Sequence, residues 1–270
     1  MVSFPPCKIN LGLNIISKRP DGYHDIVTCF YPVAWNDALD IVPAKSFSFS
    51  GSGIPIPGAA ADNLCVRAYD ILKKAYDLKP VAIHLHKVIP IGAGLGGGSA
   101  DGAYTLRTLN GIFNLELSVG KLKEYAALLG SDCAFFIENK PMIGTGRGEI
   151  LSAVDLNLKG KYFVIIKPEV HISTAKAFAG ITPQNPTTNL RQILEHHPVG
   201  EWKGLLKNDF EGELFKQFPL VEALHQKLYA YGASYASMTG SGSAVFGIFE
   251  NVVDLKKEFD GLVYWSGSLD

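Results

Sequence analysis

The sequence predicts an α+β protein built from two domains, and three observations support this fold class. Residues 81–88 (VAIHLHKV) alternate apolar and polar side chains, which predicts a half-buried strand. This strand lies between two segments with helical patterns. A continuous apolar strand at 161–168 begins a second group of strands and helices. The polar sequence at 157–160 separates the two groups. We therefore place one domain over residues 1–157 and another over 158–270, with a ligand cleft between them.

Two amphipathic segments flank the alternating strand. Residues 62–76 repeat apolar side chains at helical spacing, and Asp62 is the expected N-cap of that helix. Residues 99–113 form the second helical pattern, with Ser99 in the position that an N-cap prefers. The strand and the second helix are joined by a run of glycines, so this junction offers the N–H groups of a helix N-terminus to an anion.

The remaining elements are delimited by glycines. A helix at 121–130 stops at Gly130, and a helix at 220–232 stops at Gly232, because glycine readily ends a helix. Residues 236–250 follow as a strand, a glycine-rich loop and a second strand. The order of these elements mixes helices and strands in both halves of the chain.

Composition excludes several classes of protein. A hydrophobic content of 47% and a charged content of 19% are typical of a globular protein. The net charge is −1 and no run of Lys or Arg occurs, so we expect no nucleic-acid partner. No stretch approaches 18 apolar residues and no secretory pattern opens the chain, so we expect no membrane partner and a cytoplasmic location. We expect a monomer or a homodimer.

The cysteines favour the same compartment. None of the four is spaced as Cys-x-x-Cys, and no histidine cluster accompanies them: Cys7, Cys29, Cys65 and Cys133. Free, buried thiols in a reducing environment are the expected state.

The run IPIGAGLGGGSADGA at 89–103 permits three interpretations. It is nearly a Walker A loop, but the lysine that should follow the second glycine is missing. It also fits G-x-G-x-x-G, with Glu116 as the later acidic residue of a dinucleotide-binding fold. Thirdly, it fits a purely structural turn. So many glycines cost conformational entropy, which favours a loop whose backbone must approach a ligand closely.

Five motifs, in order along most of the chain, resemble those of the GHMP kinase superfamily. They are Lys8-Ile9-Asn10-Leu11, Lys18-Arg19-x-Asp21-Gly22-Tyr23-His24, Gly94-Leu95-Gly96-Gly97-Gly98-Ser99, Gly130-Ser131-Asp132-x-x-Phe135-Phe136, and Met238-Thr239-Gly240-Ser241-Gly242-Ser243. The Asp-Gly-Tyr-His segment resembles the branch whose acceptor is a cytidine diphosphate-linked methylerythritol. Ser131 and Ala134 depart from the pattern, since the family usually has Ala and Pro there.

The resemblance implies a fold and an activity. The fold is the two-domain GHMP kinase fold, with an N-terminal α/β domain that carries the phosphate loop and a C-terminal ferredoxin-like α+β domain. The activity is phosphorylation of the acceptor's 2-hydroxyl group by ATP with Mg²⁺, in non-mevalonate isoprenoid precursor biosynthesis. Such loops hold nucleotide phosphates through backbone N–H groups without a lysine of their own, so the resemblance nominates Lys8 as the missing cation.

The resemblance also assigns catalytic and ATP-binding residues. Asp132 is the expected base for the acceptor hydroxyl, and Lys8 keeps it ionised and adds positive charge near the γ-phosphate. Without the resemblance, the favoured interpretation of Asp132 is the N-cap of the next turn. Ser99 is a candidate ligand of Mg²⁺. The expected ATP-binding residues are Asn63, Lys87, Pro90, Ile91, Gly92, Ala93, Gly94, Leu95, Gly96, Gly97, Gly98, Ser99 and Ala100.

The acceptor-binding residues are assigned in the same way. Tyr23 and Phe178 are expected to stack on the two faces of the cytosine, and His24 to bind its edge. Asn10 is expected near the acceptor hydroxyl. The other expected contacts are Thr174, Thr239, Gly240 and Ser241. Read from the residues alone, the RPDGYH segment is simply a hairpin turn, with Pro20 fixing φ and Gly22 free to take a positive φ.

Three alternatives remain at this stage. Another GHMP kinase would phosphorylate homoserine, a sugar or mevalonate and would not need a nucleotide on its acceptor. A non-catalytic sensor would keep the glycine loop, but should lose Lys8 or Asp132, and both are present. A dinucleotide-dependent oxidoreductase would use the glycine run in the G-x-G-x-x-G arrangement.

Overall fold

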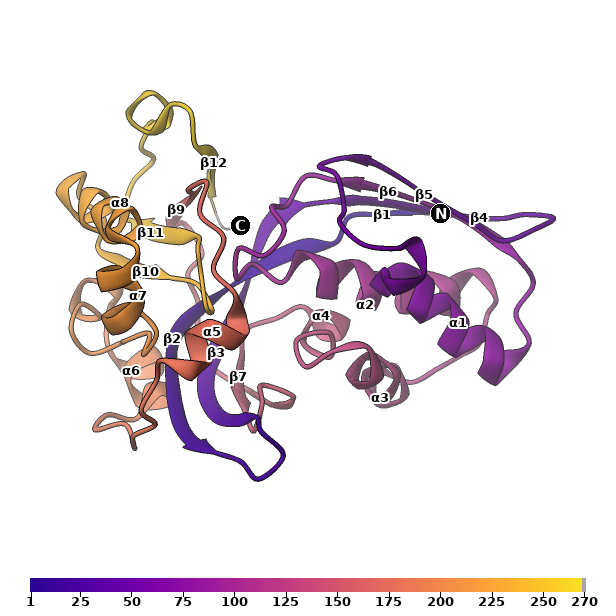
Figure 1. Cartoon of the computed structure of the whole chain (residues 1–270), viewed down its shortest axis with the longest axis horizontal. Coiled ribbons are helices and arrows are strands. Elements are labelled where there is room, and N and C mark those ends of the chain that lie inside the picture. The colour runs from indigo at the N-terminus through magenta and orange to yellow at the C-terminus, as the bar shows by residue number, and fades with distance from the viewer. Residues whose placement is uncertain (269–270) are drawn as a thin grey trace. The chain divides into compact units, whose positions relative to one another are not determined.

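The computed structural model describes residues 1–268 of the chain, which divide into two compact units (Figure 1). The first unit contains Met1–Cys7, Trp35–Ile91 and Gly96–Lys140. The second contains Lys8–Ala34, Gly92–Leu95 and the described residues from Pro141 onward. The chain therefore passes from one unit to the other several times, and the boundary expected at residue 157 falls inside the second unit.

The first unit is a four-stranded sheet with helices on one face. The strands, in their order across the sheet, are β1 (Val2–Ser3), β4 (Ala38–Pro43), β6 (Val81–Lys87) and β5 (Ser48–Gly53). The helices are α1 (Leu64–Tyr76), α2 (Gly97–Ile112), α3 (Val119–Leu129) and α4 (Phe135–Glu138), after a 3-10 turn η1 (Ala60–Asp62). Figure 1 shows α1 and α2 along one face of this sheet, and α2 also contacts α3 and α4.

The alternation predicted for residues 81–88 is confirmed in β6. Val81, Ile83 and Leu85 are buried, whereas His84 and His86 are exposed. The histidine rings bind serine hydroxyl groups of the neighbouring strand β5, so both lie on the solvent face of the sheet.

Both predicted helix starts in this unit are wrong by one or two residues. Asn63, not Asp62, caps α1, because its side chain accepts a hydrogen bond of 2.9 Å from the Cys65 N–H. Helix α2 begins at Gly97, and the left-handed Gly96 (φ 69°) precedes it where Ser99 was expected to act. Gly97 fits the first helical position because a Cβ atom there would lie 2.9 Å from both Ile89 Cγ2 and Lys87 Nζ. The predicted stop of α3 at Gly130 is confirmed.

The second unit contains two antiparallel sheets. One has the order β2 (Pro6–Lys18), β3 (His24–Asn36), β7 (Met142–Thr145) and β8 (Ile150–Ala153), with the first residues of β2 and the last of β3 belonging to the first unit. The other has the order β10 (Tyr235–Met238), β11 (Val245–Phe249), β9 (Tyr162–Lys167) and β12 (Val263–Ser268).

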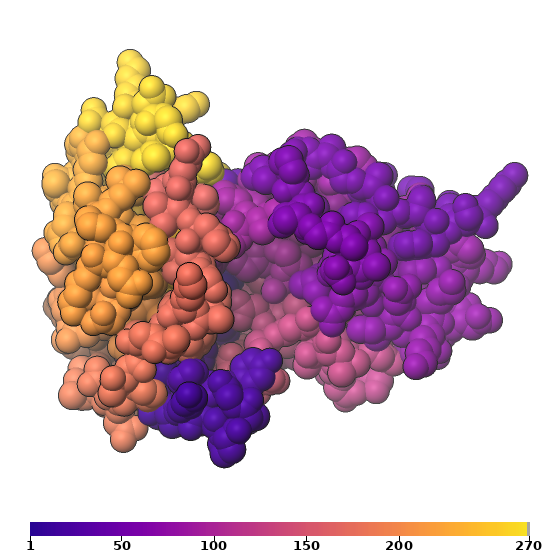
Figure 2. All heavy atoms as spheres, in the orientation of Figure 1, coloured from indigo at the N-terminus to yellow at the C-terminus, as the bar shows by residue number. Residues whose placement is uncertain are grey.

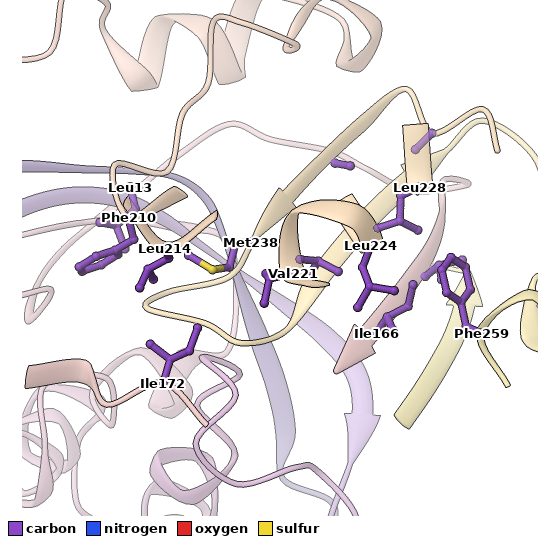
Figure 3. Close-up of a cluster of buried hydrophobic side chains, with 14 of the residues drawn as sticks. Leu13, Ile166, Ile172, Phe210, Leu214, Val221, Leu224, Leu228, Met238 and Phe259 are labelled. Atoms are coloured by element: carbon purple, nitrogen blue, oxygen red, sulfur yellow. The ribbon is translucent and has the colours of Figure 1, made fainter. Parts of the chain in front are cut away.

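Helices pack on these sheets. They are α5 (Thr174–Ala179), α6 (Leu190–His196), α7 (Glu211–Gln217) and α8 (Pro219–Ala230), with 3-10 turns η2 (Val199–Glu201) and η3 (Lys256–Phe259). Figure 3 shows the core of this unit, where Val221, Leu224 and Leu228 of α8 lie over Ile166 of β9. The apolar strand predicted at 161–168 and the strand–loop–strand at 236–250 are confirmed.

Candidate active site

Two buried polar side chains lie side by side on strand β2. Lys8 is 3% exposed and Asn10 is 1% exposed. The Lys8 ammonium group donates hydrogen bonds of 2.7 Å to Asn10 Oδ1 and 2.9 Å to the carbonyl oxygen of Gly94. The Lys8 backbone N–H also donates to the carbonyl oxygen of Leu95, at 2.9 Å. Lys8 thus ties β2 to the glycine-rich loop.

The glycine loop near the C-terminal end of the chain completes this network. The hydroxyl group of Thr239 accepts a hydrogen bond of 3.1 Å from the Asn10 N–H. It lies 3.2 Å from Asn10 Oδ1 and 3.1 Å from the Gly94 carbonyl oxygen, and its single proton serves one of them at a time. The structure therefore brings together expected site residues from three motifs that are far apart in the sequence. We call Lys8, Asn10, Gly94 and Thr239 the lysine network.

Gly94 has to be a glycine in this arrangement. Its φ is 77°, and a Cβ atom on it would lie 2.0 Å from the carbonyl oxygen of Thr239. Any side chain would push the two glycine loops apart. The close approach of backbone that the sequence predicts is thus found here, between two loops of the protein.

The expected cytosine-binding residues lie around the hairpin that joins β2 and β3. Gly22 has a φ of 85°, as predicted for this turn, and the Arg19 N–H donates to the Tyr23 carbonyl oxygen at 2.8 Å. Figure 2 shows the tip of this hairpin, in indigo, at the surface of the second unit. Tyr23 is 55% exposed, and the Arg147 guanidinium lies 4.9 Å from its ring centroid.

His24 and Phe178 are brought together by the structure. Their rings are stacked, with centroids 4.8 Å apart and planes inclined by 18°. Burial, and then the charge of Lys18, lower the pKa of His24 below its ordinary value, so the ring is neutral near pH 7. Nearby, the expected acceptor contacts Thr174 and Ser241 share a hydrogen bond of 3.0 Å between their hydroxyl groups.

The first unit contains a cavity of about 580 Å³. It is lined by Phe49, by residues 51–60 and 62–64, and by Gly98. Asn63 and Gly98 are two of the residues expected to bind ATP, and the cavity reaches the first turn of α2. Its size is within the range of small-molecule sites.

Lys87, another expected ATP contact, is 3% exposed and lies in a buried ionic cluster. Its ammonium group donates to Asp37 at 2.5 Å and to Asp101 at 2.7 Å. Asp37 also accepts the N–H groups of Val88 and Ile89, at 2.6 and 2.8 Å. Burial alone would lower the pKa of Lys87, but the two carboxylates raise it overall. The side chain of Lys87 therefore fixes the start of the loop.

Asp101 carries the excess negative charge of this cluster. Burial, opposed by the charge of Lys87 and reinforced by that of Asp37, raises the pKa of Asp101 from its ordinary value to about 7. One ammonium group between two carboxyl groups is electrically balanced when one carboxyl is protonated. Asp37 Oδ1 accepts two backbone N–H groups, whereas Asp101 Oδ1 has no hydrogen-bond partner among the described residues.

Ser99 and Asp132 both act on the thiol of Cys133. Burial raises the pKa of the Cys133 thiol to about 12, and a hydrogen bond from the Ser99 side chain opposes this rise. Cys133 follows Asp132 in the chain, within the turn that precedes α4. Mg²⁺ commonly takes one or two protein oxygen ligands together with substrate phosphates, so a hydroxyl and a carboxylate suit it. Within residues 1–268, no cluster of three or more His, Cys, Asp or Glu side chains is arranged to hold a metal.

Some organising residues escape sequence reasoning. Asp37, Asp101 and Asn208 are buried polar residues outside the motifs, and Glu211 accepts hydrogen bonds from Ser237 and Met238 beside the second glycine loop. Only the position of Asp101, two residues after Ser99 in the helix that follows the glycine run, gave any signal. The others are defined by contacts between segments far apart in the chain.

The dinucleotide-binding interpretation of the glycine run does not fit the described chain. A Rossmann unit needs a strand after the helix, parallel to the strand before it. In the structure α2 leads into α3, and the stretch around Glu116 is irregular. Every helix in the described part of the chain is too short or too polar to cross a membrane.

Comparisons with known proteins place these features in a family. The model described as "GHMP kinases N terminal domain" matches residues 63–140, and the model "GHMP kinases C terminal" matches residues 190–260. A 4-diphosphocytidyl-2-C-methyl-D-erythritol kinase of Cytophaga hutchinsonii is 50% identical over 250 residues, which is 92% of each chain. The protein of the same name from Bacteroides fragilis is 52% identical over 253 residues, again 92% of each chain.

Solved structures agree in fold. The crystal structure of a 4-(cytidine 5'-diphospho)-2C-methyl-D-erythritol kinase matches with a TM-score of 0.84 and 30% identity, covering 99% of this chain and 98% of that one. A homoserine kinase from Cytophaga hutchinsonii matches with a TM-score of 0.73 over 98% of this chain and 94% of its own. At 15% identity, this second match shows a shared fold alone.

Proposed function

The chain belongs to the family of 4-diphosphocytidyl-2-C-methyl-D-erythritol kinases, and from this premise we propose that its residues transfer the γ-phosphoryl group of ATP to the 2-hydroxyl group of that acceptor. The products are ADP and the 2-phosphate, in non-mevalonate isoprenoid precursor biosynthesis. The predicted α+β GHMP kinase fold is confirmed by the two family models and the solved structure. The observation that supports a role for particular residues is the lysine network.

Phosphoryl transfer needs alignment and charge neutralisation more than covalent chemistry. The lysine network provides a fixed positive charge, because the Lys8 ammonium group is anchored by Asn10 and by the Gly94 carbonyl oxygen. A charge held in place needs no reorganisation as negative charge develops on the transferring group. We assign Lys8 to this role and Asn10 to the orientation of the acceptor hydroxyl.

Asp132 is assigned as the general base. A carboxylate can accept the proton of the acceptor hydroxyl as the oxygen attacks phosphorus. The turn between α3 and α4 presents it, beginning where Gly130 ends α3. In this turn, Ser131 and Ala134 stand where the family usually has Ala and Pro. Asp132 itself is present at the position that the motif requires.

The nucleotide is assigned to the glycine run and the cavity of the first unit. Residues Gly92–Ser99 supply backbone N–H groups and the N-terminus of α2, whose partial positive charge favours phosphate. The cavity beside Asn63 and Gly98 suits the adenosine. Ser99 is the residue that would hold Mg²⁺, and the bound ion would neutralise phosphate charge.

The cytidine end of the acceptor is assigned to the β2–β3 hairpin and α5. A cytosine can stack on the exposed ring of Tyr23 and bind His24 through the edge of its ring. Phe178 supports His24 by stacking in this structure and is the second aromatic surface available to the base. The cytoplasmic location and the monomeric or homodimeric state stay predictions.

One experiment tests the proposal. Purified protein, ATP and Mg²⁺ are mixed with a panel of acceptors: the cytidine diphosphate-linked methylerythritol, methylerythritol phosphate, homoserine, galactose and mevalonate. Release of ADP with the first compound alone is expected, and ³¹P NMR should show a new phosphomonoester on the 2-hydroxyl group with the diphosphate intact. Equal or faster turnover of any other acceptor would contradict the assignment.

A further inference from the structure

Asn208 is a buried amide whose every polar atom is engaged. It is 2% exposed and belongs to none of the five motifs. Its Nδ2 donates hydrogen bonds of 2.8 Å to the Met238 carbonyl oxygen and 2.9 Å to the Gly240 carbonyl oxygen. Its Oδ1 accepts a bond of 3.1 Å from the Phe210 N–H. The opposite orientation of the amide would set its oxygen against two carbonyl oxygens, so these contacts fix the assignment of the two atoms.

The chain around Asn208 is pinned to strand β2. The Leu13 N–H donates to the Lys207 carbonyl oxygen at 2.8 Å, and the Asp209 N–H donates to the Leu13 carbonyl oxygen at 2.9 Å. The Asp209 carboxylate accepts the Ile15 N–H at 2.7 Å. Since β2 also carries Lys8 and Asn10, Asn208 is held in register with both.

On its other side, Asn208 grips the second glycine loop at two points. The two carbonyl oxygens that it binds flank Thr239, the residue whose hydroxyl group joins Asn10 to Gly94. Gly240 and Gly242 take positive φ values of 56° and 87°, and the loop closes on itself through hydrogen bonds of 3.0 Å from the Gly242 N–H to the Thr239 carbonyl oxygen and from the Thr239 N–H to the Ala244 carbonyl oxygen. The bridge from Asn208 joins this closed loop to the segment that is pinned to β2, and so sets where the Thr239 hydroxyl lies relative to Asn10.

We propose that Asn208 is a positioning residue for phosphoryl transfer: its amide holds Thr239 against Asn10 and so holds the Lys8 ammonium group in place. Asn208 touches neither the ammonium group nor the hydroxyl of Thr239, and it acts through the loop backbone. The inference rests on the proposed function, because it assigns the lysine network to the transfer step.

The change Asn208→Asp tests the donor role with almost no change in shape. At pH 8 the introduced carboxylate cannot donate and repels both carbonyl oxygens, so kcat should fall by at least about tenfold, within the 10²-fold that a 1 Å misplacement can cause. The KM for ATP should stay within about twofold of wild type. As pH falls to 6, the introduced group gains a proton and can donate one hydrogen bond, so the ratio of variant to wild-type kcat should rise.

Asp209→Asn is the matched control. It makes a near-isosteric change one residue away: the amide oxygen can still accept the Ile15 N–H, and only the longer bond of 3.3 Å from Asn14 Nδ2 is lost. The ratio to wild type removes the pH effects that both proteins share, and this control accounts for the nearby Glu211 carboxyl group, whose pKa is raised to about 7. Its kcat should stay within about twofold of wild type at every pH. A kcat for Asn208→Asp within twofold of wild type at pH 8, or a loss that is the same at pH 6 and pH 8, would overturn the inference.

A second measurement needs no substrate, and it tests the proposal even if Asn208→Asp folds poorly. Asn208→Ser is shorter and cannot bridge both carbonyl oxygens, so the Asn10 amide proton, which bonds to Thr239, should exchange with solvent at least about tenfold faster. The amides that pair β9 with β11 should keep their wild-type rates. Unchanged exchange at Asn10 refutes the bridge even if the protein phosphorylates its acceptor. Conversely, failure of the wild-type protein to phosphorylate any acceptor refutes the proposed function. In that case the exchange rate of the Asn10 amide proton is the remaining test of the bridge made by Asn208.

Discussion

Lys8 illustrates how a single residue is adapted to its role. A buried ammonium group is costly unless acceptors surround it, and here Asn10 Oδ1 and the Gly94 carbonyl oxygen are two of them. Asn10 is itself held by the hydroxyl groups of Thr28, at 2.9 Å, and Thr239. Asn10 Oδ1 and the Gly94 carbonyl oxygen thus help to set the position of the charge.

At Asp132, the change to Asn should remove most turnover while ATP still binds. The amide is nearly isosteric but cannot accept a proton, and general-base steps contribute about 10²- to 10⁴-fold. Initial rates and ATP affinity, measured on the same preparation, check this. Ser131→Ala, which restores the family pattern beside it, is the control and should keep the wild-type rate. Near wild-type turnover of Asp132→Asn would leave Asp132 as a turn residue only.

At Tyr23, the change to Ala should weaken acceptor binding and leave ATP binding unchanged. Base–aromatic stacking is worth about 1–3 kcal/mol, which corresponds to a roughly 5- to 150-fold rise in the acceptor's dissociation constant. Tyr23→Phe should bind almost normally, because the ring face carries the contact and also keeps its interaction with Arg147. CMP should compete with the acceptor and not with ATP. Competition with ATP, or equal binding by Tyr23→Ala, would remove the cytosine from this hairpin.

At the scale of elements, alternation in β6, the apolar run of β9 and the glycine stop of α3 were good guides, whereas β2 was missed. Strand β6 has one solvent face, so its sequence alternates and predicts it. Strand β2 was not predicted, although apolar residues recur at every second position from Cys7 to Ile15. Its polar face is buried as well, through contacts of Lys8 and Asn10 with distant segments that no local pattern shows. The start of α2 was misplaced because N-cap preference favours Ser99, whereas packing of Gly97 on the sheet decides the outcome.

Within α2, Gly97 and Gly98 should respond differently to substitution. The sequence suggests that Gly97→Val blocks ATP without unfolding the protein, but a Cβ on Gly97 would lie 2.9 Å from both Ile89 Cγ2 and Lys87 Nζ. Gly97→Val should therefore lower the Tm. Gly98 is exposed, lines the cavity and has no atom within 4 Å of a Cβ position.

Gly98→Val should keep the Tm within a few degrees and raise the KM for ATP by about tenfold or more, since the side chain projects where the nucleotide is assigned. Thermal denaturation and ATP titrations of both variants check the pair. An unchanged KM for Gly98→Val would contradict the placement of ATP in this cavity, and an unchanged Tm for Gly97→Val would contradict the packing argument.

At the scale of the whole molecule, the sequence predicted two parts but not how the chain divides between them. Composition gives a boundary as one point along the chain, whereas each unit is built from three separate segments of the chain. The candidate site shows the same limit. The motifs indicated Lys8, Asn10 and Thr239, but Asn208 and Asp37 act through contacts that no local pattern encodes.

Stability should fall as pH rises from about 4.5 to 7, in part because of Glu211. Burial raises the pKa of its carboxyl group from about 4.5 to about 7. The folded state then holds this proton more tightly than the unfolded state. Its contribution is therefore most favourable below the unfolded-state pKa and is lost by pH 7, at no more than about 1.4 kcal/mol per pH unit. Asp101, with its pKa also raised to about 7, acts in the same direction.

Comparison with Glu211→Gln isolates this group from His24 and His225, whose lowered pKa values act in the opposite sense. Urea unfolding of both proteins at pH 5, 6, 7 and 8 should show the wild type losing free energy of unfolding relative to the variant as pH rises. A difference that does not vary with pH would mean that the carboxyl group titrates normally in the folded protein.

The hydrogen bond between Asn10 and Thr239 also determines when, during synthesis of the chain, the lysine network can be completed. These two residues are 229 positions apart, and Lys8 leaves the ribosome before either. At about 5–20 residues per second, roughly 10–50 s pass between the synthesis of Asn10 and the synthesis of Thr239. During that interval the nascent chain contains the Lys8 ammonium group but not the loop that contains Thr239. Incomplete chains released before Thr239 is added therefore contain the glycine run at 92–98 but lack the hydroxyl group that joins Asn10 to Gly94.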